Sequence, residues 1–187
     1  MRRLAPIARA LAATALVAAA AGPLDARAGE VEPAVDILRD GTVEGTVVVG
    51  ATVDRVRALV GDVARLRRMS RDVKDVAVRR EGDCVVVTTR TASVLEVNYT
   101  ARRCPTADGW VETLLESDTF NDYYSEWFVH SVADGVLVRF RLRTVADLPV
   151  PDRLVRGALK KGVESVLEAI GEELGGPHDP PARVAEP

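Results

Sequence analysis

The sequence predicts an α+β fold in which a curved antiparallel sheet packs against one long C-terminal helix. Three observations predict it. Residues 42–49 have the β-branched composition of a strand, residues 72–147 form six further strands joined by short turns, and residues 152–174 have helical spacing. Because this last segment is polar along one side, its apolar stripe is expected to lie on the seven-stranded sheet.

Two short helices are expected between the first and second strands. From Ala51 to Met69 the apolar residues follow a helical period, with Thr52 as the predicted N-cap. Gly61 and Asp62 interrupt this period and divide the segment into two helices.

The six later strands are separated by breaks near 81–83, 92–94, 105–109, 121–122 and 134–135. Asp134-Gly135 is a favoured two-residue hairpin turn, which sets the register of the last two strands. Placing Cys84 opposite Cys104 sets the register of an earlier pair. Both registers give one apolar face and one polar face, and the polar face carries Arg139, Arg141 and Arg143.

The final helix has an apolar stripe, and Pro151 suits its first turn. Gly157 and Gly162 each cost about 1 kcal/mol of helix propensity relative to alanine. We interpret them as making space for a ligand, with close contact between helix and sheet as the alternative. The stripe consists of Val155, Leu159, Val163, Val166, Ile170 and Leu174.

The composition excludes several classes of protein. The chain has 187 residues, of which 47% are apolar and 28% charged, so it is neither a membrane bundle nor wholly disordered. A formal charge of −3 and only 4% aromatic residues argue against nucleic acid as a partner. One domain of ordinary size is expected.

Residues 1–28 are typical of an export signal. Arg2, Arg3 and Arg9 precede an apolar stretch from Ala10 to Ala21, and small residues end at Ala28, near the predicted cleavage point. The stretch is too short to span a bilayer, although an uncleaved amphipathic anchor is an alternative. The sequence thus predicts a periplasmic or secreted protein with an extension at 29–41, one domain at 42–174 and a disordered tail at 175–187.

Several segments, taken in order, resemble the START-like (SRPBCC) helix-grip superfamily, and within it the polyketide cyclase/dehydrase and coenzyme Q-binding branch. They are residues 49–56, Leu59 to Asp62, Trp127 before Asp134-Gly135, residues 138–142, Leu148 to Pro151 and the last helix. The resemblance implies a seven-stranded sheet that grips the helix around an apolar cavity. It also implies binding of lipids, sterols, quinones or polyketides, and in some members cyclisation or dehydration. The family often has tryptophan in the first helix and again before the second strand. This chain has Arg57 in the first place and no aromatic residue near Arg67-Arg68, so the ligand's identity does not carry over.

The inward face of the sheet is expected to be apolar, with hydroxyl groups and without charge. Buried hydroxyl groups need partners. They can bond backbone and water in a filled core, or they can line a ligand cavity. The hydroxyl-bearing residues are Thr89, Thr91, Tyr99, Thr113, Ser117, Tyr123 and Ser125. The predicted ligand-binding residues are Val87, Thr89, Val97, Tyr99, Thr113, Leu115, Tyr123, Ser125, Trp127, Phe140, Leu159 and Val163.

The cysteines and histidines favour a structural role over chemistry. Cys84 and Cys104 occupy opposed strand positions and predict a disulfide, worth about 3 kcal/mol in an oxidising compartment. His130 is expected on the outer face and His178 lies in the tail. Neither a metal site nor any cofactor is therefore expected.

No carboxyl group is expected inside the sheet. By alternation Glu96, Glu112 and Glu126 point outward, while Asp122 lies at the rim; only a bulge would bring Glu126 inside. Basic residues gather at Arg65–Lys74 and at Arg153–Lys161. Both groups are either solvated surface or flank the cavity entrance, where they would meet anionic lipid head groups.

Three functions follow from these expectations. The first is a monomeric exported carrier of a hydrophobic small molecule, in transient contact with an anionic membrane surface. The second is a cyclase/dehydrase-type enzyme that uses the same cavity, which a hydrogen-bonded carboxyl group inside would favour. The third is a filled module that acts through its surface.

Overall fold

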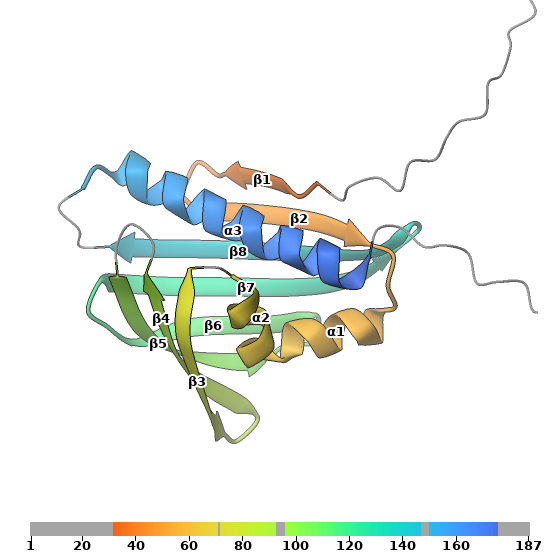
Figure 1. The fold of residues 1–187 in the computed structure, drawn as a ribbon, viewed down its shortest axis with the longest axis horizontal. Coiled ribbons are helices and arrows are strands. Elements are labelled where there is room, and N and C mark those ends of the chain that lie inside the picture. The colour runs from red at the N-terminus through yellow and green to blue at the C-terminus, as the bar shows by residue number, and fades with distance from the viewer. Residues whose placement is uncertain (1–31, 71, 93–95, 147–149, 176–187) are drawn as a thin grey trace, which may run out of the picture.

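The fold consists of an antiparallel sheet of eight strands, one long helix across one of its faces and two short helices between its second and third strands (Figure 1). It is known from a computed structural model, which describes residues 32–70, 72–92, 96–146 and 150–175. The strand order is β1-β2-β8-β7-β6-β5-β4-β3, and neighbouring strands pair antiparallel. The predicted α+β class and helix-grip arrangement are confirmed.

The elements follow each other as the sequence predicts, apart from the first. Their bounds are β1 Ala34–Ile37, β2 Val43–Val49, α1 Val53–Gly61, α2 Val63–Met69, β3 Val73–Glu81, β4 Cys84–Ala92, β5 Glu96–Pro105, β6 Gly109–Ser117, β7 Phe120–Val132, β8 Gly135–Ala146 and α3 Asp152–Leu174.

The sheet has eight strands, so the prediction of seven is wrong. The additional strand β1 lies in the segment expected to be an extension, and it pairs with β2 from Ala34 opposite Thr46 to Ile37 opposite Val43. It is only four residues long and buries one side chain, Val35. A strand this short gives almost no alternation to recognise. The predicted export signal lies outside the described residues, as does nearly all of the predicted tail.

The first short helix begins at its predicted cap, and the second begins at the predicted break. The Thr52 hydroxyl accepts a hydrogen bond from the backbone N–H of Arg55 at 3.3 Å, which caps α1. The Asp62 carboxylate accepts one from the N–H of Arg65 at 3.0 Å, which caps α2. The chain therefore turns at Asp62 and places α2 beside β3.

The predicted register of β4 and β5 is confirmed, with Thr89 opposite Tyr99. The predicted faces of β7 and β8 are confirmed as well, with Trp127 opposite Phe140. Their two-residue turn is Ala133-Asp134 rather than the predicted Asp134-Gly135, because Gly135 already pairs with Val132. The turn before β7 differs, because it occupies residues 118–119 rather than 121–122. There the Ser117 hydroxyl accepts hydrogen bonds from the N–H groups of Thr119 and Phe120, which closes the turn earlier than the sequence indicates.

Helix α3 lies on what we call the inner face of the sheet, and it packs mainly against β1, β2 and β8 (Figure 1). Its contact with β2 is close because residue 45 is glycine. A Cβ atom at Gly45 would lie 2.5 Å from Leu167 Cδ1 and 2.6 Å from Val163 Cγ1. A Cβ atom at Gly157 or Gly162 would meet nothing within 4 Å, and Gly162 is exposed. The close helix–sheet contact is therefore made possible by a glycine of the sheet.

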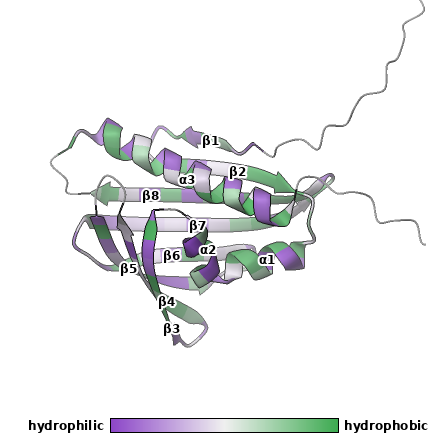
Figure 2. Cartoon of the chain, viewed as in Figure 1, coloured by the Kyte–Doolittle hydropathy of each residue, from purple (hydrophilic) through white to green (hydrophobic). Residues whose placement is uncertain are grey.

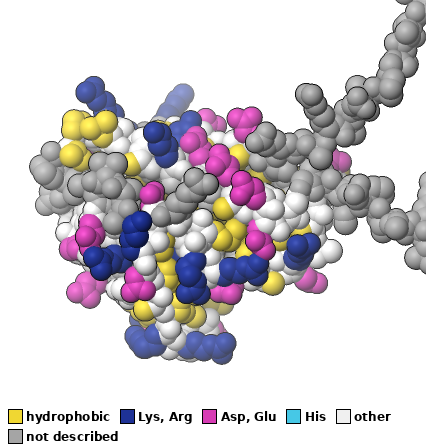
Figure 3. All heavy atoms as spheres, viewed as in Figure 1, with side chains coloured by type: hydrophobic (Ala, Val, Ile, Leu, Met, Phe, Trp, Pro, Cys, Tyr) yellow, Lys and Arg dark blue, Asp and Glu magenta, His cyan; other side chains and the backbone are white. Residues whose placement is uncertain are grey.

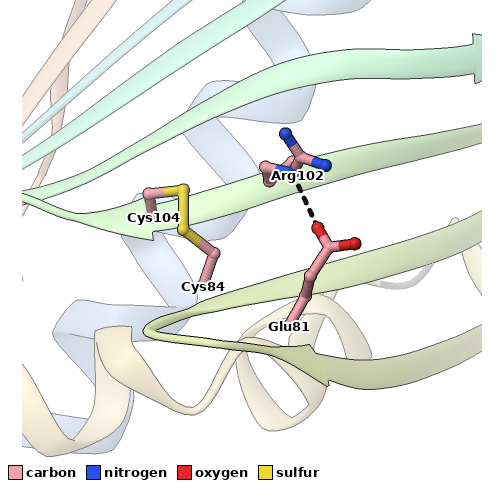
Figure 4. Close-up of a disulfide and its surroundings, with 4 residues drawn as sticks. All are labelled: Glu81, Cys84, Arg102 and Cys104. Carbon is pink, nitrogen blue, oxygen red and sulfur yellow. Dashed lines mark hydrogen bonds and ion pairs between the residues drawn. A yellow bond between two sulfur atoms is a disulfide. The ribbon is translucent and has the colours of Figure 1, made fainter.

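Cys84 and Cys104 form a disulfide between β4 and β5, as predicted (Figure 4). Beside it, Arg102 of β5 donates a hydrogen bond to Glu81 of β3 at 2.8 Å, so three neighbouring strands are linked at this end (Figure 4). No helix among the described residues has the length and apolar character needed to cross a membrane.

Candidate functional site

Two separate groups of apolar side chains lie on the inner face. The larger group fills the space between α3, α1 and strands β2, β7 and β8. The smaller group, which we call the second cluster, is centred on three buried residues of β5 and β7: Tyr99, Ala101 and Tyr123. Half-buried apolar residues complete it, namely Val97, Leu114, Phe120 and Leu142. No residue of α3 belongs to the second cluster.

Three aromatic rings pack together in the second cluster. The rings of Tyr99 and Tyr123 lie with centroids 4.9 Å apart, and Phe120 lies 5.7 Å from Tyr99. The hydroxyl oxygen of Thr89, opposite Tyr99, is buried and has no hydrogen-bond partner in the described part of the chain. A buried polar atom without a partner carries a desolvation cost, which a ligand group can remove.

A charged cluster borders this surface, formed by Arg67, Arg103, Glu112 and Tyr123. Arg103 Nη1 donates to Glu112 Oε1 at 2.8 Å. Arg67 Nη2 donates to Glu112 Oε2 at 2.5 Å and to the hydroxyl of Tyr123 at 3.0 Å. The Tyr123 hydroxyl lies 3.0 Å from Glu112 Oε2 and donates to it. Arg103 and Glu112 are fully buried, so the ion pair lies inside the protein.

The two guanidinium groups keep Glu112 ionised. Burial alone would raise the pKa of Glu112, but the positive charges of Arg67 and Arg103 outweigh it and hold the pKa below its ordinary value. Burial raises the pKa of the Tyr123 hydroxyl well above its ordinary value, so this group stays neutral and can donate a hydrogen bond. The site therefore presents a fixed carboxylate rather than one ready to exchange a proton.

The expectation of a charge-free inner face is wrong, and so is the outward placement of Glu112. The register of β5 and β6 shifts between Thr100 and Ala101, which pair with Glu116 and Leu114. Leu115 is left over as a bulge. After the bulge, Ser117 points inward as expected. Before the bulge, the alternation of inward and outward side chains is the reverse of the prediction, so Glu112 points inward.

The same bulge overturns the expected inward placement of two predicted ligand-binding residues. Thr113 is exposed, and Leu115 is 47% exposed. Arg103 could have been recognised from the sequence, because it alternates with Tyr99 and Ala101 on a strand whose register was predicted correctly. Nothing in the sequence marks the bulge itself.

The other predicted ligand-binding residues lie on the inner face in three settings. Val87, Thr89, Val97, Tyr99, Tyr123 and Ser125 lie in or beside the second cluster. Trp127 and Phe140 stack with centroids 4.0 Å apart in the larger group, which also contains Val163. Leu159 of α3 is half-buried at the edge of that group.

The other acidic residues lie where the alternation places them. Glu126 is on the outer face, where Tyr124 donates a hydrogen bond to it at 2.5 Å. Glu96 is exposed and pairs with Arg90, while Asp122 pairs with Arg143. Within the described ranges, no three His, Cys, Asp or Glu side chains are grouped as a metal site would require.

A surface pocket of about 260 Å³ lies apart from the charged cluster, between α1, α2 and the end of α3. It is lined by Arg55, Ala58, Leu59, Arg65, Glu173 and Leu174. Arg65 and Glu173 form an ion pair across it. Because this pair is partly exposed, it is expected to add little stability.

The fold agrees with that of known proteins. The model of the family described as "Polyketide cyclase / dehydrase and lipid transport" matches residues 40–175. The chain therefore belongs to this family. No curated protein matches the sequence.

Three solved structures illustrate the similarity. A START superfamily protein from Mycobacterium smegmatis has a TM-score of 0.63 and 17% identity, covering 71% of this chain and 96% of that chain. The Zhui aromatase/cyclase from Streptomyces sp. R1128 has a TM-score of 0.58 and 21% identity, covering 71% and 92%. A STAR-related lipid transfer protein from Xanthomonas axonopodis has a TM-score of 0.59 and 15% identity, covering 76% and 92%. At these identities the likeness concerns the fold.

Proposed function

We propose that this protein binds and carries a hydrophobic small molecule, such as a lipid, quinone, sterol or polyketide, on the inner face between α2, α3 and strands β4–β7. The second cluster carries the proposal, because half-buried apolar side chains surround its buried centre and no residue of α3 joins them. Covering apolar surface stabilises a complex by about 25 cal/mol per Å². The similarity to a lipid transfer protein and to an aromatase/cyclase supports the same class of ligand.

The carrier is favoured over an enzyme by the state of Glu112. A carboxyl group inside the molecule is the feature expected of a cyclase or dehydrase, and this observation keeps that function as the alternative. A general acid or base must exchange a proton near the working pH. Each oxygen of Glu112 accepts a hydrogen bond from an arginine and its pKa is lowered, which suits an anchoring role better.

The proposal is tested by native mass spectrometry of the protein purified from its own host. A copurifying lipophile is expected, and Leu142→Gln should reduce its occupancy roughly tenfold, because a polar group then faces the second cluster. Leu137→Gln is the matched control, since Leu137 is also half-buried in β8 but faces the other side of the sheet. Repeated absence of any lipophile from the wild type, or equal loss in both variants, would contradict the proposal.

We also propose that the protein is exported. The leader pattern of residues 1–28 supports this, and the Cys84–Cys104 disulfide is compatible with an extracellular location. The mass of the mature chain tests the proposal, because cleavage after Ala28 leaves Gly29 as the first residue. A full-length chain confined to the cytoplasm would contradict it.

Transient contact with an anionic membrane surface is proposed for the beginning of α3. Its first half carries Arg153, Arg156, Lys160 and Lys161, and Leu154 among them is 59% exposed. Hydrophobic side chains and Lys or Arg side chains lie next to each other at this end of the molecule (Figure 3). Such a surface can meet lipid head groups with its charges and the lipid interface with its apolar side chain. The working form is proposed to be a monomer.

A further inference from the structure

The buried charged cluster contains one more positive charge than negative charge. Arg67 and Arg103 both form ion pairs with Glu112, and neither pairs with a second carboxylate among the described residues. An uncompensated charge inside a protein is costly unless another group neutralises it. The cluster therefore lacks one negative charge.

Arg103 is held by groups of the protein itself. Besides its bond to Glu112, its Nη2 donates to the backbone carbonyl of Val60 at 2.6 Å. Its guanidinium carbon lies 5.1 Å from the ring centroid of Trp110 and 6.0 Å from that of Trp127. With 1% of its side chain exposed, Arg103 has no room to turn toward a ligand. We assign it the role of holding Glu112 in place.

Arg67 is held less completely and points toward the proposed ligand site. It comes from α2, part of whose ribbon has the colour of hydrophilic residues in Figure 2, and 18% of its side chain is exposed. Both of its hydrogen bonds to described residues use Nη2, whereas Arg103 uses both of its terminal nitrogens. The buried Nε of each arginine has no partner among the described residues. Its guanidinium carbon lies 5.7 Å from the ring centroid of Tyr99, which belongs to the second cluster.

We propose that the bound hydrophobic molecule carries an anionic group, a carboxylate or a phosphate, and that Arg67 binds this group. The inference rests on the proposed function and names the chemistry of the ligand's polar end. A guanidinium group has five donors in one plane, so Arg67 can donate to a ligand anion while Nη2 stays bonded to Glu112. The anion supplies the missing charge, and the apolar part of the ligand covers the second cluster.

The test compares two fluorescent probes that differ only in charge: 11-(dansylamino)undecanoic acid and its methyl ester. The acid is expected to bind the wild type at least about tenfold more tightly than the ester, because charge-assisted hydrogen bonds are the stronger kind. Arg67→Gln should abolish this preference, so that the acid and the ester bind with equal affinity. Arg68→Gln, an exposed neighbour in the same helix, should retain it.

A second variant guards against a folding defect. Arg67→Lys keeps the charge but loses the planar donors, so its preference for the acid should lie between those of the wild type and Arg67→Gln. Displacement of the acid probe by dodecanoate or by dodecyl phosphate then distinguishes the two anionic groups. The more effective competitor shows whether the anionic group of the ligand is a carboxylate or a phosphate.

The outcomes separate this inference from the proposed function. Equal affinity of the wild type for the acid and the ester would overturn the inference and leave the carrier function standing. A preference that survives in Arg67→Gln would overturn the assignment to Arg67. No binding of either probe would overturn the proposed function and the inference with it.

Discussion

Glu112 is the residue on which both the stability and the chemistry of the inner face depend. Replacing it by glutamine leaves two buried guanidinium groups without a carboxylate, and breaking such a pair costs about 3–5 kcal/mol. Urea unfolding at pH 7 should therefore show a large loss for Glu112→Gln. Glu116→Gln is the control, because Glu116 is exposed on the same strand and should change stability by less than about 0.5 kcal/mol.

The effect of Glu112 should also depend on pH in a definite direction. The pKa of this carboxyl group is lower in the folded protein than in the unfolded chain, so its ionised form stabilises the fold above the unfolded value. That contribution is lost as the pH falls through the lower, folded value. The difference between wild type and Glu112→Gln should thus be smaller at pH 3 than at pH 7. A constant difference between the two would contradict the lowered pKa.

Gly45 gives a second prediction at the scale of one residue. Gly45→Ala puts a methyl group within 2.6 Å of side chains of α3, and overpacking of this kind costs about 1–3 kcal/mol. Gly157→Ala is the matched control, because the new methyl group meets nothing within 4 Å and should stabilise the helix by up to about 1 kcal/mol. Thermal or urea unfolding checks both. Destabilisation by the two changes alike would mean that α3 lies elsewhere.

At the scale of elements, α3 carries its charges unevenly. Asp152 lies in its first turn, four basic residues follow between 153 and 161, and Glu172 and Glu173 lie in its last turn. Acidic residues in a last turn are unfavourable to the helix dipole by a few tenths of a kcal/mol each. The helix itself gains nothing from gathering four basic residues in one half, and a partner of negative charge near residues 153–161 explains them better.

Binding to vesicles tests this explanation. Arg153→Gln combined with Lys161→Gln should weaken binding to vesicles of phosphatidylglycerol and phosphatidylcholine roughly fivefold per charge, at about 1 kcal/mol each. The corresponding double change at Arg79 and Arg80 of β3 is the control. Cosedimentation measures both. Equal binding to vesicles of phosphatidylcholine alone would rule out an electrostatic contact.

The elements also show what the sequence could and could not predict. Caps, turn residues and alternation are local, and they predicted α1, α2, α3 and the two faces of two hairpins correctly. The bulge at Leu115 was not predictable, because it depends on how β5 pairs with β6 and not on any residue in it. Because of this one extra residue, the first part of β6 faces the opposite way from the prediction, and the carboxylate of Glu112 lies in the interior instead of at the surface.

At the scale of the whole molecule, the fold was easier to predict than the site. The order of the elements and the resemblance to the START-like superfamily were enough to predict the arrangement of sheet and helix. The charged cluster joins residues from α2, β5, β6 and β7, which are up to 56 positions apart in the chain. A network of this kind is stabilised by mutual contacts that no single segment reveals.

The short strand β1 has a consequence for how copies of the protein meet. It occupies the hydrogen-bonding edge of β2 along Val43–Thr46, in a strand where four of seven residues are valine. An uncovered edge of this composition is a template on which strands of other molecules can assemble. Proteolytic removal of the chain up to Ile37 would therefore expose this edge and allow strands of other copies to pair with it. The four residues of β1 thus protect the protein from aggregation.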